Sequence, residues 1–227
     1  MDRRRYVQSI GTVGVAATAG CLGAIPGVGD SRTVLDPPEI DLSAADHPSY
    51  GDDLPSVSLP DPLLGEEIST EQFEGERAIL MTFIYTNCPN GMCPALTLRL
   101  RRAQAVAAEK GYGDESAFLA TTFDPERDTA DVLEDYADRQ GVDVDAGNWH
   151  FLRPESYEAG TELIEENFGL VIEKVDSDDY ETLEYAFPHY NLILLANRDG
   201  VVERAYPNGA TVDVDRVVED FETVVTA

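Results

Sequence analysis

Two cysteines separated by four residues are the residues of this sequence best suited to chemistry. Cys88 and Cys93 enclose the tetrapeptide Pro-Asn-Gly-Met, and Pro94 follows directly. A cysteine acts as a nucleophile or a soft metal ligand in its thiolate form, which the N-terminus of a helix favours. Because an Asn-Gly step makes a tight turn easy, we expect the two sulfurs to approach closely enough to bond to each other or to share one metal ion.

A permanent structural disulfide is the other interpretation of this pair. Such bridges are common in exported proteins, so this alternative stays open. A bridge across so short a loop would remove little entropy from the unfolded chain. Hydrophobic residues make up 43% of the sequence, which provides a core without a bridge. The sequence therefore favours a redox pair or a metal site.

Three histidines are candidates for a third ligand. His47 lies in a polar segment and is expected to be solvated, and His150 lies on an apparent strand and is expected to be structural. His189 directly precedes the apolar run Asn191–Ala196. Taken alone it predicts a packed or surface side chain, but in a thioredoxin-like sheet the loop before that strand lies beside the cysteine loop. Two thiolates and one imidazole suit Cu(I) and adapt to Cu(II), whereas structural zinc normally takes four ligands.

Strands and helices alternate from about Ser56 onward, and they must position these residues. The strands expected from apolar runs are Val57–Leu59 and Glu67–Ser69 as a hairpin, Ala78–Tyr85, Phe118–Phe123, Trp149–Leu152, Asn191–Ala196 and Val201–Tyr206. The helices expected from helical spacing are Pro94–Glu109, one that begins at Asp128 or Thr129, Glu155–Phe168 and Val212–Val225. This order predicts an α/β sandwich with a mixed sheet, and it places Cys88 and Cys93 between a buried strand and the helix near Pro94.

The N-terminal segment predicts export and attachment to a membrane. In residues 1–20, three arginines precede a Gly- and Ala-rich stretch that is too short and too weakly apolar to span a bilayer. The arginine run resembles a twin-arginine signal, and Thr18–Cys21 resembles a lipobox, which would make Cys21 a lipidated N-terminus. An ordinary cleaved signal with an incidental cysteine is the alternative. Residues 21–55, rich in Gly, Pro, Asp and Ser, are interpreted as a flexible tether before the domain of residues 56–227.

Acidic residues dominate the sequence. Forty-four acidic residues and sixteen basic residues give a formal net charge of −28. This charge repels nucleic acid and anionic lipid, so neither is an expected partner. At molar salt the Debye length falls to roughly 3 Å and the repulsion among carboxylates is screened, so we interpret the composition as halophilic. A specific acidic docking surface is the alternative.

From about Ser56 to the C-terminus the sequence resembles the Sco/SenC family of copper-binding assembly proteins, which are thioredoxin-like. Phe83–Pro94 (FIYTNCPNGMCP) is similar to the family's cysteine motif, Thr121–Thr129 (TTFDPERDT) to its Asp-Pro-Glu-Arg-Asp-Thr segment, and His189–Gly200 (HYNLILLANRDG) to its ligand-histidine strand. The chain differs in having four residues instead of three between the cysteines. The acidic residue often found there is absent unless Asn90 takes its place.

The resemblance implies a thioredoxin-like three-layer sandwich with a central mixed sheet and an N-terminal β-hairpin. It implies that Cys88, Cys93 and His189 bind one copper ion per chain and that the two cysteines form a redox pair. The implied function is a copper chaperone, held at the outer face of the cell membrane by a lipid on Cys21. It would deliver copper to, or prepare, the dinuclear copper centre of a terminal respiratory oxidase. The copper-centre subunit is the implied partner, with other copper chaperones as further candidates.

A thiol–disulfide oxidoreductase that keeps a partner's cysteines reduced is the second hypothesis. Dedicated reductases of this fold usually have two residues between the cysteines and a cis-proline just before a strand. Pro188 lies near such a place, but the distance from His189 to Gly200 fits the histidine motif better, so the spacing favours metal binding. A peroxidase is least favoured, because Cys93 lacks the supporting Thr and Arg pattern.

Four charged residues of the TTFDPERDT segment allow two interpretations. In the first, Asp128 caps the following helix while Arg127 pairs with a carboxylate and fixes the loop. In the second, Asp124 and Glu126 join them in surrounding the metal or in docking a partner. No catalytic role is expected for these residues.

Overall fold

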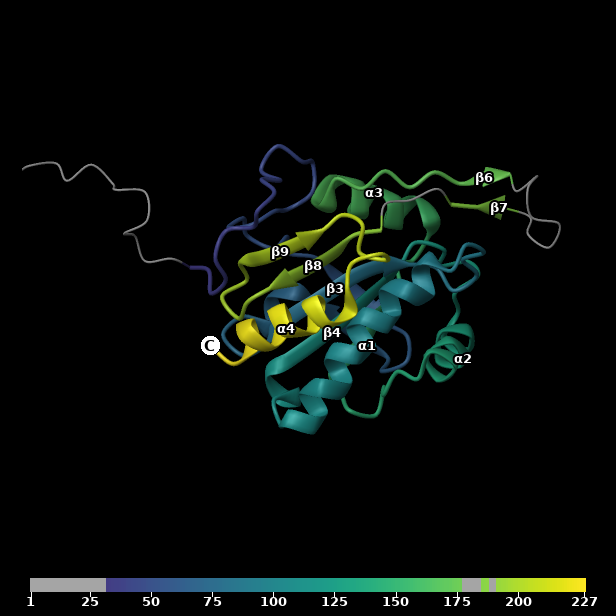
Figure 1. Ribbon diagram of the computed structural model, residues 1–227. Helices are drawn as coiled ribbons and strands as arrows, with labels where there is room; N and C mark the ends of the chain where they lie inside the picture. Colours follow the sequence, from purple (N-terminus) through teal and green to yellow (C-terminus); the bar gives the residue numbers. More distant parts are fainter. Residues whose placement is uncertain (1–31, 177–184, 188–190) are drawn as a thin grey trace, which may run out of the picture. The chain divides into compact units, whose positions relative to one another are not determined.

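A five-stranded mixed sheet forms the centre of the structure, a computed structural model that describes residues 32–176, 185–187 and 191–227 (Figure 1). Its strands are β3 (Ala78–Ile84), β4 (Ser116–Thr122), β5 (Trp149–Leu152), β8 (Ile193–Ala196) and β9 (Val202–Tyr206). The strand order is β5-β4-β3-β8-β9. Strands β3, β4 and β5 run parallel, whereas β8 is antiparallel to β3 and β9 is antiparallel to β8.

The two central strands bring the segments of interest to one edge of the sheet. Every residue of β3 and β4 is buried, as expected for parallel strands covered on both faces. The last residues of the two strands, Ile84 and Thr122, are register partners. The loop that contains Cys88 and the loop that contains Asp124 and Asp128 therefore begin side by side.

Helices cover both faces of the sheet. They are α1 (Met92–Lys110), α2 (Ala130–Gln140), α3 (Tyr157–Phe168) and α4 (Val214–Val225). Phe118 of β4 contacts Phe221 of α4, with ring centroids 5.2 Å apart. Phe83 of β3 contacts Phe168 of α3, at 4.9 Å. Because Phe118 is in register with Leu80, three residues before Phe83, these two contacts lie on opposite faces.

Three helices share the α4 face. Helix α1 lies beside α4 (Figure 1). The hydroxyl groups of Thr97 in α1 and Tyr136 in α2 are 2.9 Å apart, which joins α2 to the same layer. The result is the α/β three-layer sandwich with a thioredoxin-like sheet that the sequence predicts. Among the residues that the structure describes, no helix is both long and apolar enough to cross a membrane.

The described residues also form two small antiparallel pairs of strands and two short 3-10 helices. The predicted N-terminal hairpin is present as β1 (Ser58–Asp61) and β2 (Glu66–Ser69). A second pair is formed by β6 (Val175–Asp176) and β7 (Tyr185–Ala186). These residues show no apolar periodicity that would indicate a strand, so the pair is absent from the sequence prediction. The 3-10 helices are η1 (Thr70–Phe73) and η2 (Gly113–Glu115).

The first main helix begins earlier than predicted. Helix α1 starts at Met92, two residues before Pro94, because Gly91 takes a left-handed conformation with a φ of 74° and serves as the N-cap residue. Cys93 is therefore part of the first turn of α1, and only Cys88 lies in the preceding loop. The remaining predicted strands and helices agree with the structure to within about two residues, the usual uncertainty of element ends.

Residues 32–55, the described part of the segment predicted as a tether, belong to the same compact unit as the sheet. The buried carboxylate of Glu203 accepts hydrogen bonds from the backbone N–H groups of Val34 (2.7 Å) and Leu35 (3.0 Å). Leu54 N–H donates to the Gly200 carbonyl at 2.7 Å. These contacts are made by backbone groups, so they require no particular side chains in residues 32–55. For that reason the sequence of this segment resembles that of a linker.

Candidate metal and redox site

The structure brings the two cysteines together at the N-terminus of α1. The backbone N–H of Cys93 donates to Sγ of Cys88 at 3.4 Å. In its protonated form the Cys88 thiol donates to Oδ1 of Asn90 at 2.9 Å, and the same oxygen accepts the N–H of Met92 at 3.1 Å. The two cysteines are not joined by a disulfide. The first backbone N–H groups of α1 therefore point to Sγ of Cys88 or to Asn90, the residue hydrogen-bonded to that sulfur. This is the arrangement expected at the N-terminus of a helix.

Gly91 allows the four-residue spacing. Its left-handed φ of 74° is readily adopted by glycine, and this conformation turns the chain from the cysteine loop into α1. A Cβ added at Gly91 would meet no atom within 4 Å, so the turn depends on backbone conformation rather than on close packing. The additional residue of this loop thus lies in an exposed turn, and the contact between Cys88 and Cys93 is retained.

The two thiols have opposite electrostatic surroundings. The hydrogen bond from the Cys93 thiol, aided by backbone N–H groups of Cys93 and Met92, lowers the pKa of Cys88 to about 6 against the effect of burial. Burial raises the pKa of Cys93 well above its usual range, and the hydrogen bond to Cys88 adds to this shift. Cys88 is half-buried, whereas Cys93 is buried. Near neutral pH the pair therefore holds one accessible thiolate and one proton.

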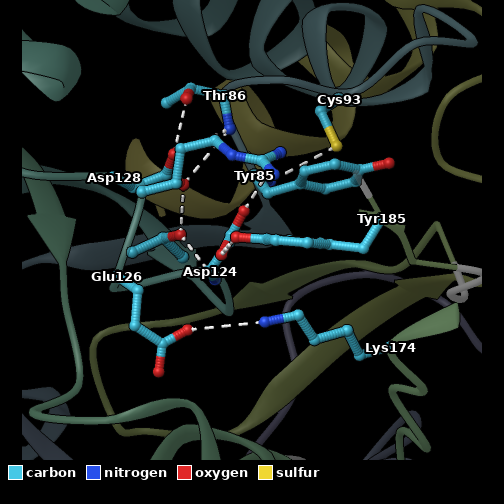
Figure 2. Close-up of polar contacts among 10 residues, drawn as sticks. Tyr85, Thr86, Cys93, Asp124, Glu126, Asp128, Lys174 and Tyr185 are labelled. Carbon is cyan, nitrogen blue, oxygen red and sulfur yellow. Dashed lines mark hydrogen bonds and ion pairs between the residues drawn. The ribbon is translucent and has the colours of Figure 1, made fainter. Parts of the chain in front are cut away.

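Asp128 holds the start of the cysteine loop. Its buried carboxylate accepts the backbone N–H of Thr86 at 3.1 Å and the hydroxyl groups of Thr86 and Thr122, each at 2.5 Å (Figure 2). Burial raises the pKa of Asp128 to about 6, although the three donors act in the opposite direction. Thr129 is the N-cap residue of α2, one of the two positions predicted, although its side chain makes no capping hydrogen bond. The interpretation in which Asp128 caps α2 is wrong, because its carboxylate turns inward to Thr86 and Thr122.

Asp124 joins the same loop to β7. The Tyr185 hydroxyl donates to Oδ1 of the buried Asp124 carboxylate at 2.9 Å. Arg127 pairs with Oδ2 of Asp124 at 3.4 Å, which confirms the predicted pairing of Arg127 with a carboxylate. The Arg127 guanidinium lies 4.1 Å from the centroid of the Tyr185 ring. The Lys174 ammonium lies 3.8 Å from the same centroid (Figure 2). Lys174 also pairs with Glu126 at 3.9 Å. Burial raises the pKa of Asp124.

Sequence reasoning missed Tyr185 and Lys174. Both lie in a segment without helical or strand periodicity, and their partners are far away along the chain. The only available signal was composition, because Lys174 is one of just two lysines in the sequence.

An aromatic cluster connects β7 to the cysteine site. The buried Phe187 ring lies 5.1 Å from the ring of Tyr85 and 5.4 Å from that of Phe123. Tyr85 follows β3 directly, and its backbone N–H donates to Sγ of Cys93 at 3.4 Å. Phe187, two residues before His189 in the sequence, is therefore separated from the buried sulfur by a single aromatic residue.

The remaining candidate residues fall into two groups. His189 and Cys21 lie outside the described residues. His150 is buried with its Nδ1 atom 3.3 Å from Oδ2 of Asp61, in agreement with a structural role. His47 is half-buried rather than fully solvated, and its Nδ1 atom contacts the Pro48 carbonyl at 3.0 Å. Within the described part of the chain, no three His, Cys, Asp or Glu side chains gather as a metal site.

Solved structures share this fold. A SCO1/SenC family lipoprotein from Bacillus anthracis is 21% identical, with a TM-score of 0.61 over 78% of this chain and 95% of that one. BsSco, described as a member of the Sco family of cytochrome c oxidase assembly proteins with a disulfide switch, is 22% identical, with a TM-score of 0.60 over 78% and 96%. Copper-bound ScoI from Arabidopsis thaliana is 17% identical, with a TM-score of 0.56 over 79% and 100%.

The comparison of sequences identifies the family. A search of curated proteins returned no match. The model of the SCO1/SenC family, in contrast, matches residues 63–226, which include the hairpin strand β2, the whole central sheet and both cysteines. Since this match covers well over half of the 227 residues, the chain belongs to the SCO1/SenC family.

Proposed function

We propose that this protein is a membrane-tethered copper chaperone that delivers copper to, or prepares, the dinuclear copper centre of a terminal respiratory oxidase. The observation that carries the proposal is the unequal thiol pair at the N-terminus of α1 in a member of the SCO1/SenC family. Family members include an assembly protein of cytochrome c oxidase and proteins solved with copper bound. The partner would be the copper-centre subunit of the oxidase, with other copper chaperones as possible donors.

The proposed ligands are Cys88, Cys93 and His189. Two adjacent sulfurs form a soft donor set, which suits Cu(I) better than a hard cation. Phe187 and Asn191 each lie two residues from His189 in the sequence. The Phe187 ring packs against Tyr85, whose backbone N–H donates to Sγ of Cys93. Because two residues extend for at most about 7 Å, this anchor supports His189 as the third ligand.

The unequal thiols give an order to copper capture and release. Cys88 is half-buried and ionised near neutral pH, so it can take Cu(I) from a donor without first losing a proton. Cys93 retains its proton until the metal displaces it, so binding releases one proton from this buried sulfur. During delivery the accessible Cys88 is the sulfur that a partner's ligand can reach first.

Attachment to the membrane is the second part of the proposal. A twin-arginine signal in residues 1–20 and a lipid on Cys21 would place the domain at the outer face of the cell membrane. The relative from Bacillus anthracis that shares the fold is described as a lipoprotein. An acidic surface repels anionic lipid, so a covalent anchor is needed to keep this protein near the bilayer.

Copper titration of the reduced full-length protein tests the ligand set. In molar salt we expect one Cu(I) per chain, measured by competition with a chromophoric Cu(I) chelator. His189→Ala should lower the affinity at least about tenfold, because a lost ligand in a three-coordinate site has no replacement among the described residues. His47→Ala is the matched control and should bind as the wild type does. Stoichiometric binding that is unaffected by His189→Ala would rule out the three-ligand site.

A thiol–disulfide oxidoreductase is the second candidate function, favoured by the low pKa of Cys88 beside a protonated Cys93. The Cys88 thiolate would attack a partner disulfide, forming a mixed disulfide and releasing one partner thiolate. After losing its proton, Cys93 would attack Cys88, releasing the second partner thiolate and leaving a Cys88–Cys93 disulfide. Rapid exchange with a model disulfide, together with weak copper binding, would favour this function over copper delivery.

A further inference from the structure

The loop between β4 and α2 contacts two separate parts of the site. We call residues 124–128 the Asp loop. Its first residue, Asp124, contacts β7 through Tyr185, and its last residue, Asp128, contacts the start of the cysteine loop through Thr86 (Figure 2). None of these contacts is needed for the chemistry proposed above, so the two buried carboxylates require a separate explanation.

The Asp loop is itself rigidly held. The backbone N–H groups of Arg127 and Asp128 both donate to the Asp124 carbonyl, at 3.1 Å and 2.9 Å. The guanidinium of Arg153, just after β5, donates twice to the Pro125 carbonyl, at 3.1 Å and 2.7 Å. The distance between the two carboxylates is therefore fixed by a closed turn anchored to the sheet.

Asp128 is well placed to fix the cysteine loop. Its carboxylate is completely buried, and its three donors come from Thr86 and Thr122, which follow or end the paired strands β3 and β4. Hydrogen bonds to a buried charged acceptor are stronger than those between neutral groups. Thr86 lies two residues before Cys88, so a displacement at Thr86 carries directly to that sulfur.

Asp124 is placed in the same way for the β6–β7 pair. The pair has only two residues in each strand, and all four are exposed or half-buried, so its own ladder and packing hold it weakly. The hydrogen bond from Tyr185 and the two cations on its ring attach β7 to the Asp loop. Asp124 and Arg127 thereby add polar contacts to the aromatic packing of Phe187, which directly follows β7.

We propose that the Asp loop is a positioning element with two separable contacts. Asp128 positions the cysteine loop, and Asp124 positions β7 through Tyr185. The role assigned to Asp124 rests on the proposed function, because β7 comes shortly before the proposed ligand His189 in the sequence. Asp124, Asp128 and Tyr185 are positioning residues, and none of them is a metal ligand or a nucleophile.

The first contact is tested in metal-free, reduced full-length protein. Asp128→Asn replaces a carboxylate that faces three donors with an amide whose NH₂ group is itself a donor. We expect the alkylation rate of Cys88 at pH 7, followed by peptide mapping, to fall about tenfold as Sγ leaves the N–H of Cys93. Thr86→Ser keeps both donors and should react as the wild type does.

Glu203→Gln is the matched control for the first contact. Glu203 is also a buried carboxylate that accepts backbone N–H groups, but it binds Val34 and Leu35 instead of the cysteine loop. Glu203→Gln should lower the midpoint of unfolding about as much as Asp128→Asn does. It should leave the alkylation rate of Cys88 unchanged. Equal rates in Asp128→Asn and wild type, or an equal fall in Glu203→Gln, would overturn the assignment of Asp128.

The second contact is tested with Tyr185→Phe, which removes one hydroxyl and keeps the ring. We expect the backbone amide of Ala186 in β7 to exchange with solvent about tenfold faster, while Cys88 alkylation stays unchanged. Tyr206→Phe is the matched control, because the Tyr206 hydroxyl donates to Asp220 at 2.7 Å, away from the Asp loop. Unchanged exchange in Tyr185→Phe, or slower Cys88 alkylation in the same variant, would contradict two separable contacts.

A copper readout separates this inference from the proposed function. In copper-loaded protein, Tyr185→Phe should shift the visible absorption of the Cu(II) form, and Tyr206→Phe should not, although both lose a Tyr–Asp hydrogen bond. Alkylation and amide exchange need no metal. If the protein binds no copper, the proposed function fails while those two measurements still decide the role of the Asp loop. If copper binds and Tyr185→Phe leaves the absorption unchanged, the role of Asp124 in positioning the metal site is refuted.

Discussion

Cys88 and Cys93 are chemically unequal because a helix turn places one sulfur inside the protein and leaves the other at its edge. Cys93 lies three residues before Leu96 and seven before Leu100, and all three face the core from α1. That apolar spacing is visible in the sequence and predicts that Cys93 is the buried partner. The lowered pKa of Cys88 is not visible there, because it depends on where the N–H and the thiol of Cys93 point after α1 begins at Met92.

Substitution of Cys93 tests this inequality. In wild type, Cys88 reacts as a thiolate, so its alkylation rate should fall as the pH decreases through about 6 and level off above about pH 7. Cys93→Ala removes the thiol donor and should raise the midpoint toward the ordinary cysteine pKa, about 8.5. Cys93→Ser keeps an O–H donor and should leave the midpoint near that of wild type. Alkylation rates between pH 5 and 9 measure all three.

At the scale of elements, the sequence predicts what apolar patterns determine and misses what polar contacts determine. The buried runs in β3 and β4 predict the central strands to within a residue or two. The β6–β7 pair has no such pattern. Tyr185 attaches it through its hydroxyl and the cations on its ring, and the buried ring of Phe187, directly after β7, packs against Tyr85. A glutamate at position 203 of β9 is typical of a solvent-facing strand position. The backbone N–H groups of Val34 and Leu35 nevertheless donate to the Glu203 carboxylate, and the residue is buried. The pairing of Arg127 with a carboxylate was predicted, whereas Asp124 as its partner and the inward turn of Asp128 were not.

Substitutions of Gly91 test the junction between the cysteine loop and α1. Gly91→Ala should lower the free energy of unfolding by about 1 kcal/mol, because alanine disfavours the left-handed φ of 74° while its Cβ meets no other atom. Gly91→Asn should cost less, since asparagine tolerates this conformation better. Denaturant unfolding in molar salt measures both. A loss well above about 2 kcal/mol for Gly91→Ala would mean that Gly91 also has a packing role.

Over the whole molecule, charge controls the conditions under which the fold is stable. With a net charge of −28, carboxylates repel one another across the surface, and mobile ions reduce that repulsion. The strands β3 and β4 at the centre of the sheet are buried and insensitive to salt. The effect of salt therefore concentrates on the exposed faces of the helices, such as that of α2. There Glu134 and Asp138 are both exposed and lie four residues apart, a spacing at which like charges destabilise a helix.

The salt dependence of stability is the corresponding prediction. The midpoint of thermal unfolding should rise by about 10 °C or more between 0.1 M and 2 M sodium chloride, as the Debye length falls from about 10 Å to below 3 Å. The double variant Glu134→Gln, Asp138→Asn should raise the midpoint at 0.1 M and leave it nearly unchanged at 2 M. Calorimetry at both salt concentrations provides the comparison. Equal stabilisation by the double variant at both would show that helix propensity, and not charge, is responsible.

If the protein is anchored as proposed, the attachment of Val34 and Leu35 to the carboxylate of Glu203 limits how far the domain can move from the membrane. With a lipid on Cys21, a free linker through residue 55 would extend for at most about 120 Å, whereas one that ends at Val34 extends for about 45 Å. The accessible volume grows as the cube of that reach, so the attachment shrinks it by roughly twentyfold and raises the effective concentration of the cysteine pair near the bilayer. In the proposed lipid-anchored protein, Glu203, remote in sequence from the cysteines, would therefore govern how often they encounter the proposed membrane-bound partner.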